Sequence, residues 1–152
     1  MRNIGIRVSP RIVTFAIYEK KDANIINIED IKIPVALFMP DALKYIRNVI
    51  IDILREYQIT DAGIRITESN AQKISIERIQ IEGVIQEAFA SSNLNSYYVG
   101  QISSISARIG IPRTDFKKYI SNDLVLENIE GWADMSINQK EAVLCAIGAS
   151  HD

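Results

Sequence analysis

The first third of the chain alternates apolar and polar residues in three runs that are separated by polar turns. Apolar side chains recur at every second position of a run, which is the period of a half-buried strand. We predict strands over residues 3–9, 12–18 and 25–33. The connections at Ser9-Pro10-Arg11 and at 20–24 are short, so the three strands are expected to form an antiparallel meander.

After Pro34 the pattern changes to helices that alternate with strands. Apolar residues between 41 and 57 recur at helical spacing, and Pro40 stands where a first helical residue is expected. Further strands are predicted over 62–67, after a turn at Thr60-Asp61, and over 97–99. Further helices are predicted over 74–91, 103–110, 114–120 and from Ser136, whose spacing to Gln139 is typical of a capping box.

Two stretches stand out within this pattern. Gly83 lies inside the helix 74–91, where Ile76 and Ile79 are among the apolar residues whose spacing marks the helix. A glycine there costs about 1 kcal/mol relative to alanine, so it suggests a close approach between helix and sheet. The stretch 123–134 is the least regular part of the chain and carries Trp132.

Length and composition fit one α/β domain over residues 1–152, a mixed sheet with helices on its faces. The formal net charge is −2, which argues against a strongly basic nucleic-acid module. A single cysteine, Cys145, excludes a disulfide framework, and the single histidine, His151, is the penultimate residue. The chain shows no apolar run long enough to span a membrane and no signal peptide, so a cytoplasmic location is expected.

Several residues along this order match a known family. The segment 5–17 is an apolar hairpin with a Ser9-Pro10 turn, Glu68 follows the predicted strand 62–67, Gly83 lies in the following helix, and Glu141 lies in the last helix. Together they resemble the ribonuclease H-like superfamily, and within it the Holliday-junction resolvases of the RuvC type. The resemblance implies a five-stranded mixed sheet of order 3-2-1-4-5 in which strand 2 is antiparallel.

The sequence departs from this family at the residue that matters most for catalysis. The resemblance implies an aspartate on the first strand as the central metal ligand, but Arg7 stands there. It also implies an acid or histidine three residues before Glu141, where this chain has Asn138; Asp134 is a further carboxylate nearby. Catalysis by two divalent cations needs carboxylate ligands, and a guanidinium supplies no oxygen. We therefore expect no catalytic residues and no bound metal at Arg7, Glu68, Asn138 and Glu141.

A guanidinium binds carboxylates in a bidentate fork. We accordingly predict that Arg7 pairs with Glu68, Glu141 or both. The function predicted first is that of a non-catalytic, resolvase-like pseudo-nuclease that serves as a protein-interaction or regulatory domain, with a protein partner or a second copy. The chain is expected not to be an enzyme and to need no cofactor.

Two other functions stay open. One is binding of structured nucleic acid without cleavage, through basic residues that we list as candidates: Arg65, Lys73, Arg78, Arg108, Arg113, Lys117 and Lys118. The other is a Mg²⁺- or Mn²⁺-dependent nuclease that uses Glu68 and Glu141.

The remaining candidates have structural explanations as well. Trp132 is a candidate anchor for a partner surface, although fastening its own loop is the favoured role. Tyr97 and Tyr98 are expected on opposite sides of the sheet. Cys145 is expected to be a buried, unreactive thiol, because no histidine is placed to activate it.

Overall fold

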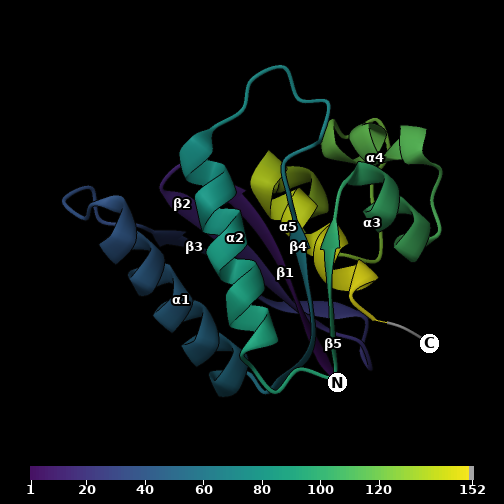
Figure 1. Cartoon of the computed structure of the whole chain (residues 1–152). Helices are drawn as coiled ribbons and strands as arrows, with labels where there is room; N and C mark the ends of the chain where they lie inside the picture. The colour runs from purple at the N-terminus through teal and green to yellow at the C-terminus, as the bar shows by residue number, and fades with distance from the viewer. Residues whose placement is uncertain (151–152) are drawn as a thin grey trace.

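The computed structural model describes residues 1–150 and contains a five-stranded sheet with helices on both faces (Figure 1). The strands are β1 (Arg2–Ser9), β2 (Ile12–Glu19), β3 (Asn24–Lys32), β4 (Ile59–Arg65) and β5 (Ser96–Gly100). Their order is β3-β2-β1-β4-β5. Strand β2 is antiparallel to β1 and β3, while β4 is parallel to β1 and β5. The predicted meander and mixed sheet are confirmed.

The helices divide between the two faces of the sheet. Helices α1 (Met39–Glu56) and α2 (Ile76–Ala90) cover one face, and α5 (Ile137–Gly148) covers the other. Helices α3 (Ile102–Ile109) and α4 (Arg113–Ile120) pack beside α5, and a short 3₁₀ turn follows at Trp132–Asp134. The predicted capping box at the start of α5 is present. His151 lies outside the described residues.

Strand β1 shows how the sequence separates the two faces. Ile4, Ile6 and Val8 are fully buried in the core beneath α1 and α2. The alternate residues Asn3, Gly5 and Arg7 point to the α5 side, where the Asn3 amide donates to the carbonyl oxygen of Ala146 at 3.1 Å. Polar residues on this second face therefore meet a helix rather than solvent.

Helix α5 lies directly on β1 because residue 5 has no side chain. A Cβ atom at Gly5 would lie closer than 3.0 Å to the backbone of Ala142 and Ala146. Gly63, the register partner of Gly5 on β4, is covered by the Tyr98 ring in the same way. Gly5 therefore sets the depth at which α5 sits against β1, and Gly63 makes room for the Tyr98 ring.

Strand β4 begins earlier than the sequence predicts. It runs from Ile59, so the expected turn at Thr60-Asp61 is wrong. Asp61 is buried inside the strand, and its carboxylate accepts hydrogen bonds from the hydroxyls of Thr60 and Ser96. Adjacent polar residues such as Thr60 and Asp61 are typical of a turn. Here they fit inside a strand, because Ser96 of β5, which is distant in sequence, donates a hydrogen bond to Asp61.

Helix α2 also differs from the prediction. Gly83 has no atom within 4 Å of the Cβ position, so it marks no close approach to the sheet. Ile76 and Ile79, whose spacing helped to mark the helix, are 73% and 43% exposed. The helix carries apolar residues on all sides, so spacing alone could not identify the face that it buries, which consists of Ile81, Glu82, Ile85, Ala88 and Phe89.

The irregular stretch after α4 is held by Trp132. Its ring is 1% exposed, meets Tyr119 edge to face, and its Nε1 donates to the Tyr119 carbonyl oxygen at 3.2 Å. Lys140 also lies against this ring and donates to Asn122. The tryptophan therefore fastens its own segment, and the candidate role as an exposed partner anchor is wrong.

The two tyrosines of β5 lie on opposite sides of the sheet, as predicted. Tyr97 is half-exposed against Phe89, whereas Tyr98 is buried and donates from its hydroxyl to the Cys145 carbonyl oxygen at 2.8 Å. Cys145 is fully buried, and burial raises the pKa of its thiol to about 11. The thiol is therefore protonated near neutral pH. Among the described residues, no helix is long and apolar enough to cross a membrane.

Candidate functional site: a buried ion network

Two arginines emerge side by side at the ends of β1 and β4. Arg7 and Arg65 are register partners on these parallel strands, and their side chains lie on the α5 face. They are 9% and 5% exposed. Two guanidinium groups held this close need anionic partners, because burial of an unpaired charge is costly.

Glu141 of α5 is the anion that the two arginines share. Its Oε1 accepts a hydrogen bond from Arg65 Nε at 2.9 Å, and its Oε2 lies 3.5 Å from Arg7 Nε, which is an ion-pair contact rather than a hydrogen bond. Arg7 also donates to the carbonyl oxygen of Arg65 at 3.3 Å. The predicted pairing of Arg7 with Glu141 is thus present in the structure.

Glu68 takes part through a different arginine. Its Oε2 lies 3.0 Å from Nη1 of Arg65 and accepts the backbone N–H of Ile102, the first residue of α3, at 2.8 Å. A third cation, Arg113 of α4, lies 3.9 Å from Oε1. Arg65 therefore supplies the close ion pair to Glu68 that the sequence assigned to Arg7, and Glu68 satisfies an otherwise free N–H at a helix start.

Two further charged residues from α2 complete the surroundings of Arg7. Glu82 is buried, and its Oε2 accepts hydrogen bonds from the backbone N–H and the hydroxyl of Thr67 at 3.0 and 2.9 Å. Burial lowers the pKa of Arg7, Glu141 opposes that effect, and the nearby charges of Arg65 and Arg78 add to it. The arginine stays protonated, because guanidinium groups do not lose their proton in proteins.

Glu82 is a charged member of this region that the sequence did not predict. No signal in the sequence could have identified it, because α2 carries apolar residues on all sides and their spacing does not show which face is buried. Lys140, also buried, was missed for the same reason: it lies in an apolar helix and donates to the Ile120 carbonyl oxygen.

The ion network consists of Arg7, Arg65, Glu68 and Glu141. Its two carboxylates are engaged by cationic side chains and, at Glu68, by a backbone N–H group. Within residues 1–150, no group of three or more His, Cys, Asp or Glu side chains is arranged to hold a metal ion. Asn138 is half-buried with its amide 3.5 Å from the Ser9 hydroxyl, and Asp134 is exposed on the 3₁₀ turn. A divalent cation at Glu141 would compete with two guanidinium groups.

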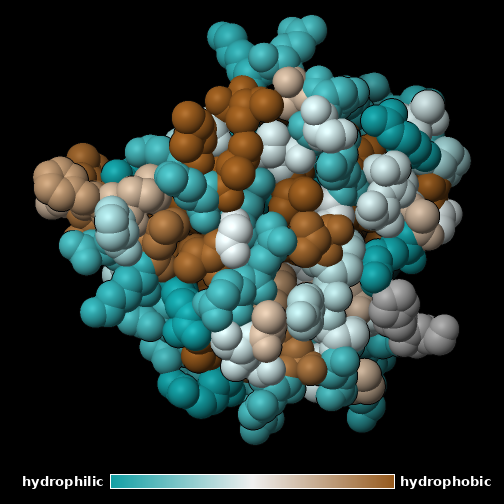
Figure 2. All heavy atoms as spheres, in the orientation of Figure 1, coloured by the Kyte–Doolittle hydropathy of each residue, from teal (hydrophilic) through white to brown (hydrophobic). Residues whose placement is uncertain are grey.

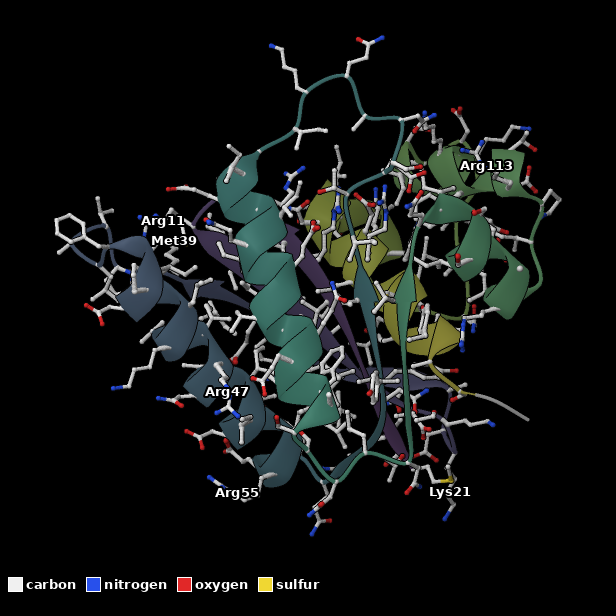
Figure 3. The ribbon with its side chains drawn as sticks, in the orientation of Figure 1. Arg11, Lys21, Met39, Arg47, Arg55 and Arg113 are labelled. Carbon is white, nitrogen blue, oxygen red and sulfur yellow. The ribbon has the colours of Figure 1, made fainter. Side chains whose placement is uncertain are left out.

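The basic candidates do not form one patch. Arg65 is inside the network, Arg78 is partly buried, and Lys73 is exposed before α2. Arg108 lies 3.8 Å above the Tyr98 ring and donates to the Gly148 carbonyl oxygen. Helix α4 carries the other three candidates, Arg113 (labelled in Figure 3), Lys117 and Lys118, and all three are exposed. The ammonium group of Lys118 lies 3.6 Å from the Asp115 carboxylate.

Comparison with solved structures identifies the architecture. A Thermus thermophilus RuvC in complex with a Holliday-junction substrate superimposes with a TM-score of 0.72 at 9% identity, over 97% of this chain and 91% of that chain. A second T. thermophilus RuvC structure gives 0.69 at 11% identity, over 97% of this chain and 92% of that chain. The chain has the ribonuclease H-like fold. The predicted fold and the structural similarity to RuvC are thereby confirmed.

A viral resolvase also resembles this chain, with a lower TM-score. The fowlpox virus Holliday junction resolvase superimposes with a TM-score of 0.50 at 16% identity, over 98% of this chain and 94% of that chain. No protein-family model matches the sequence. A search of curated proteins finds no match either. At these identities the comparisons establish the ribonuclease H-like fold, and the chemistry has to be argued from the residues of this chain.

Proposed function

We propose that this chain is a non-catalytic ribonuclease H-like domain that acts by binding a partner. The observation that supports it is the sharing of Glu141 by Arg7 and Arg65. Hydrolysis by two divalent cations requires carboxylate oxygens that are free to ligate, since the cations activate water and stabilise the leaving oxygen. Here two fixed positive charges occupy the carboxylate instead, and neither offers a ligand oxygen.

A protein is the partner class that the charges favour. Several basic candidates are occupied within the chain: Arg65 by two glutamates, Arg108 by Tyr98 and Gly148, and Lys118 by Asp115. Phosphate binding depends on cations that are free to replace counterions. With an overall charge of −2, the chain is better suited to a protein surface than to a polyanion.

Binding of structured nucleic acid without cleavage is the second candidate. One observation favours it: the RuvC with which this chain superimposes over 97% of its length is in complex with a Holliday-junction substrate. Lys73, Arg113 and Lys117 are exposed and could contact phosphates.

One assay with two readouts tests these proposals. The protein is incubated with four-way-junction, duplex and single-stranded DNA and with an RNA–DNA hybrid, in the presence of Mg²⁺ or Mn²⁺. We expect no cleavage. Cleavage that Glu68→Gln abolishes would overturn the non-catalytic proposal. Binding that weakens steeply with salt, without cleavage, would select the nucleic-acid alternative over the protein partner.

Restoring an aspartate on β1 should not by itself restore metal binding. In Arg7→Asp, Arg65 still holds both Glu141 and Glu68, so calorimetry should detect no micromolar Mn²⁺ affinity. In Arg7→Asp/Arg65→Gln, Glu141 loses both of its cations and Glu68 loses the closer of its two, beside a new carboxylate at position 7. Mn²⁺ should then raise the thermal unfolding temperature, because a ligand that binds only the folded state stabilises it.

The control for this pair is Arg55→Gln, which removes an exposed arginine whose partner is Asp52. It should show no response to Mn²⁺. Micromolar Mn²⁺ affinity in the Arg7→Asp variant alone would show that Arg65 does not block the carboxylates.

A further inference from the structure

A pocket opens beside the ion network, between α4 and α5. Its volume is about 270 Å³. Arg65 and Glu141 contribute to its lining, and its apolar lining comes from Ile102, Phe116, Ile120 and Ile137. Because the pocket shares two residues with the network, an occupant would lie next to the position at which this fold carries its catalytic centre in nucleases.

Arg65 and Glu141, the two charged residues that the lining shares with the network, are already paired. Nε of Arg65 donates to Glu141, and Nη1 of Arg65 contacts Glu68 and donates to the carbonyl oxygen of Ile66. An occupant therefore gains burial of apolar surface here rather than new hydrogen bonds. An apolar cavity of about 150 Å³ already admits benzene, so this pocket has room for one large apolar side chain.

The mouth of the pocket carries positive charge. Lys117 is exposed on α4 and lines the pocket, and Arg113, one turn earlier, has a side chain that is 59% exposed and 3.9 Å from Glu68. Lys118 follows, although it pairs with Asp115. An acidic surface around the occupant would complement these cations, and such complementarity orients a partner and suppresses wrong ones.

We propose that this pocket receives an aromatic or branched apolar side chain of a protein partner, with acidic residues of the partner against Lys117 and Arg113. This proposal rests on the proposed binding function and names the chemistry of the partner. A buried apolar anchor surrounded by polar contacts is the usual arrangement of a binding hot spot. A nucleobase fits less well, because Phe116 is the one aromatic residue of the lining and few polar groups are free to read a base edge.

The test uses defined peptides and NMR titration of the full chain, which detects weak binding. The probe is a short peptide of Asp, Glu, Gly and Ser with one central Phe. Its controls are the same peptide with Ala for Phe and the same peptide with Lys for the acids. We expect the Phe peptide to shift the resonances of pocket residues and to bind at least about tenfold tighter than either control.

Variants of the chain locate the site. Ile120→Trp fills the pocket and Lys117→Glu reverses the charge at its mouth, and each should weaken the Phe peptide about tenfold. Lys44→Glu is the charge-matched control on α1, at the opposite face of the sheet, and should bind as the native chain does. Thermal unfolding of each variant verifies that it folds, and Lys117→Glu changes an exposed residue only.

The outcomes separate this proposal from the proposed function. Absence of binding, or equal binding of the Phe and Ala peptides, would overturn the pocket proposal, while the non-catalytic assignment depends on the cleavage assay alone. Oligothymidine serves as the probe for the alternative occupant. If it binds and Ile120→Trp abolishes that binding, the pocket takes a base and the protein-side-chain proposal is wrong.

Discussion

Replacing Glu141 with glutamine should lower the free energy of unfolding by about 3–5 kcal/mol, the usual cost of breaking a buried ion pair on one side. The variant keeps the shape of the side chain but leaves Arg7 and Arg65 adjacent, buried and without their shared anion. Urea unfolding followed by circular dichroism measures the loss directly.

Glu87→Gln is the matched control for this variant. Glu87 also pairs with an arginine, Arg47, but its side chain is 52% exposed, and surface pairs contribute little. The free energy of unfolding should hardly change. If Glu141→Gln proved as mild as Glu87→Gln, the two buried arginines would have to be compensated by something other than Glu141.

Gly5→Ala should be similarly damaging, with a loss of about 3 kcal/mol or more, or no folded protein. The added methyl group would overlap the backbone of Ala142 and Ala146, and backbone cannot turn aside as a flexible side chain does. Helix α5 would have to move away from β1, which also separates Glu141 from Arg7. Urea unfolding and soluble yield measure the effect.

Gly83→Ala is the same chemical change as Gly5→Ala, but we expect it to stabilise the protein. Gly83 lies within α2 with nothing within 4 Å of its Cβ position, so alanine should raise the free energy of unfolding by about 1 kcal/mol. A loss of stability in Gly83→Ala would contradict the open space at this position and show that a Cβ atom there meets part of the chain.

The sheet could be predicted because its strands follow simple rules. The three runs of the meander alternate with a period of two, and the structure shows those strands with ends that shift by at most one residue. The start of β4 could not be predicted, because the hydroxyl of Ser96 that satisfies Asp61 belongs to another strand. Gly83 was misinterpreted because an exposed glycine and a closely packed one look the same in sequence.

The ion network was predictable only in part. Arg7 and Glu141 stood at positions that the family resemblance relates to each other, so their contact was expected. The central role of Arg65 depends on the register of β1 against β4, which places Arg65 opposite Arg7. A sequence pattern gives the faces of a strand but not its register against a distant parallel strand, so Arg65 was assigned to a surface patch.

The sharing of Glu141 has a consequence for how this chain can change over time. A replacement of Glu141 alone leaves two buried guanidinium groups without the anion that they share, whereas a replacement of Arg7 alone leaves Glu141 paired with Arg65. Drift at Glu141 is therefore blocked unless the arginines change with it. Among descendants of a common ancestor, these three positions should vary together or stay fixed, which makes them a covarying unit inside an otherwise tolerant fold.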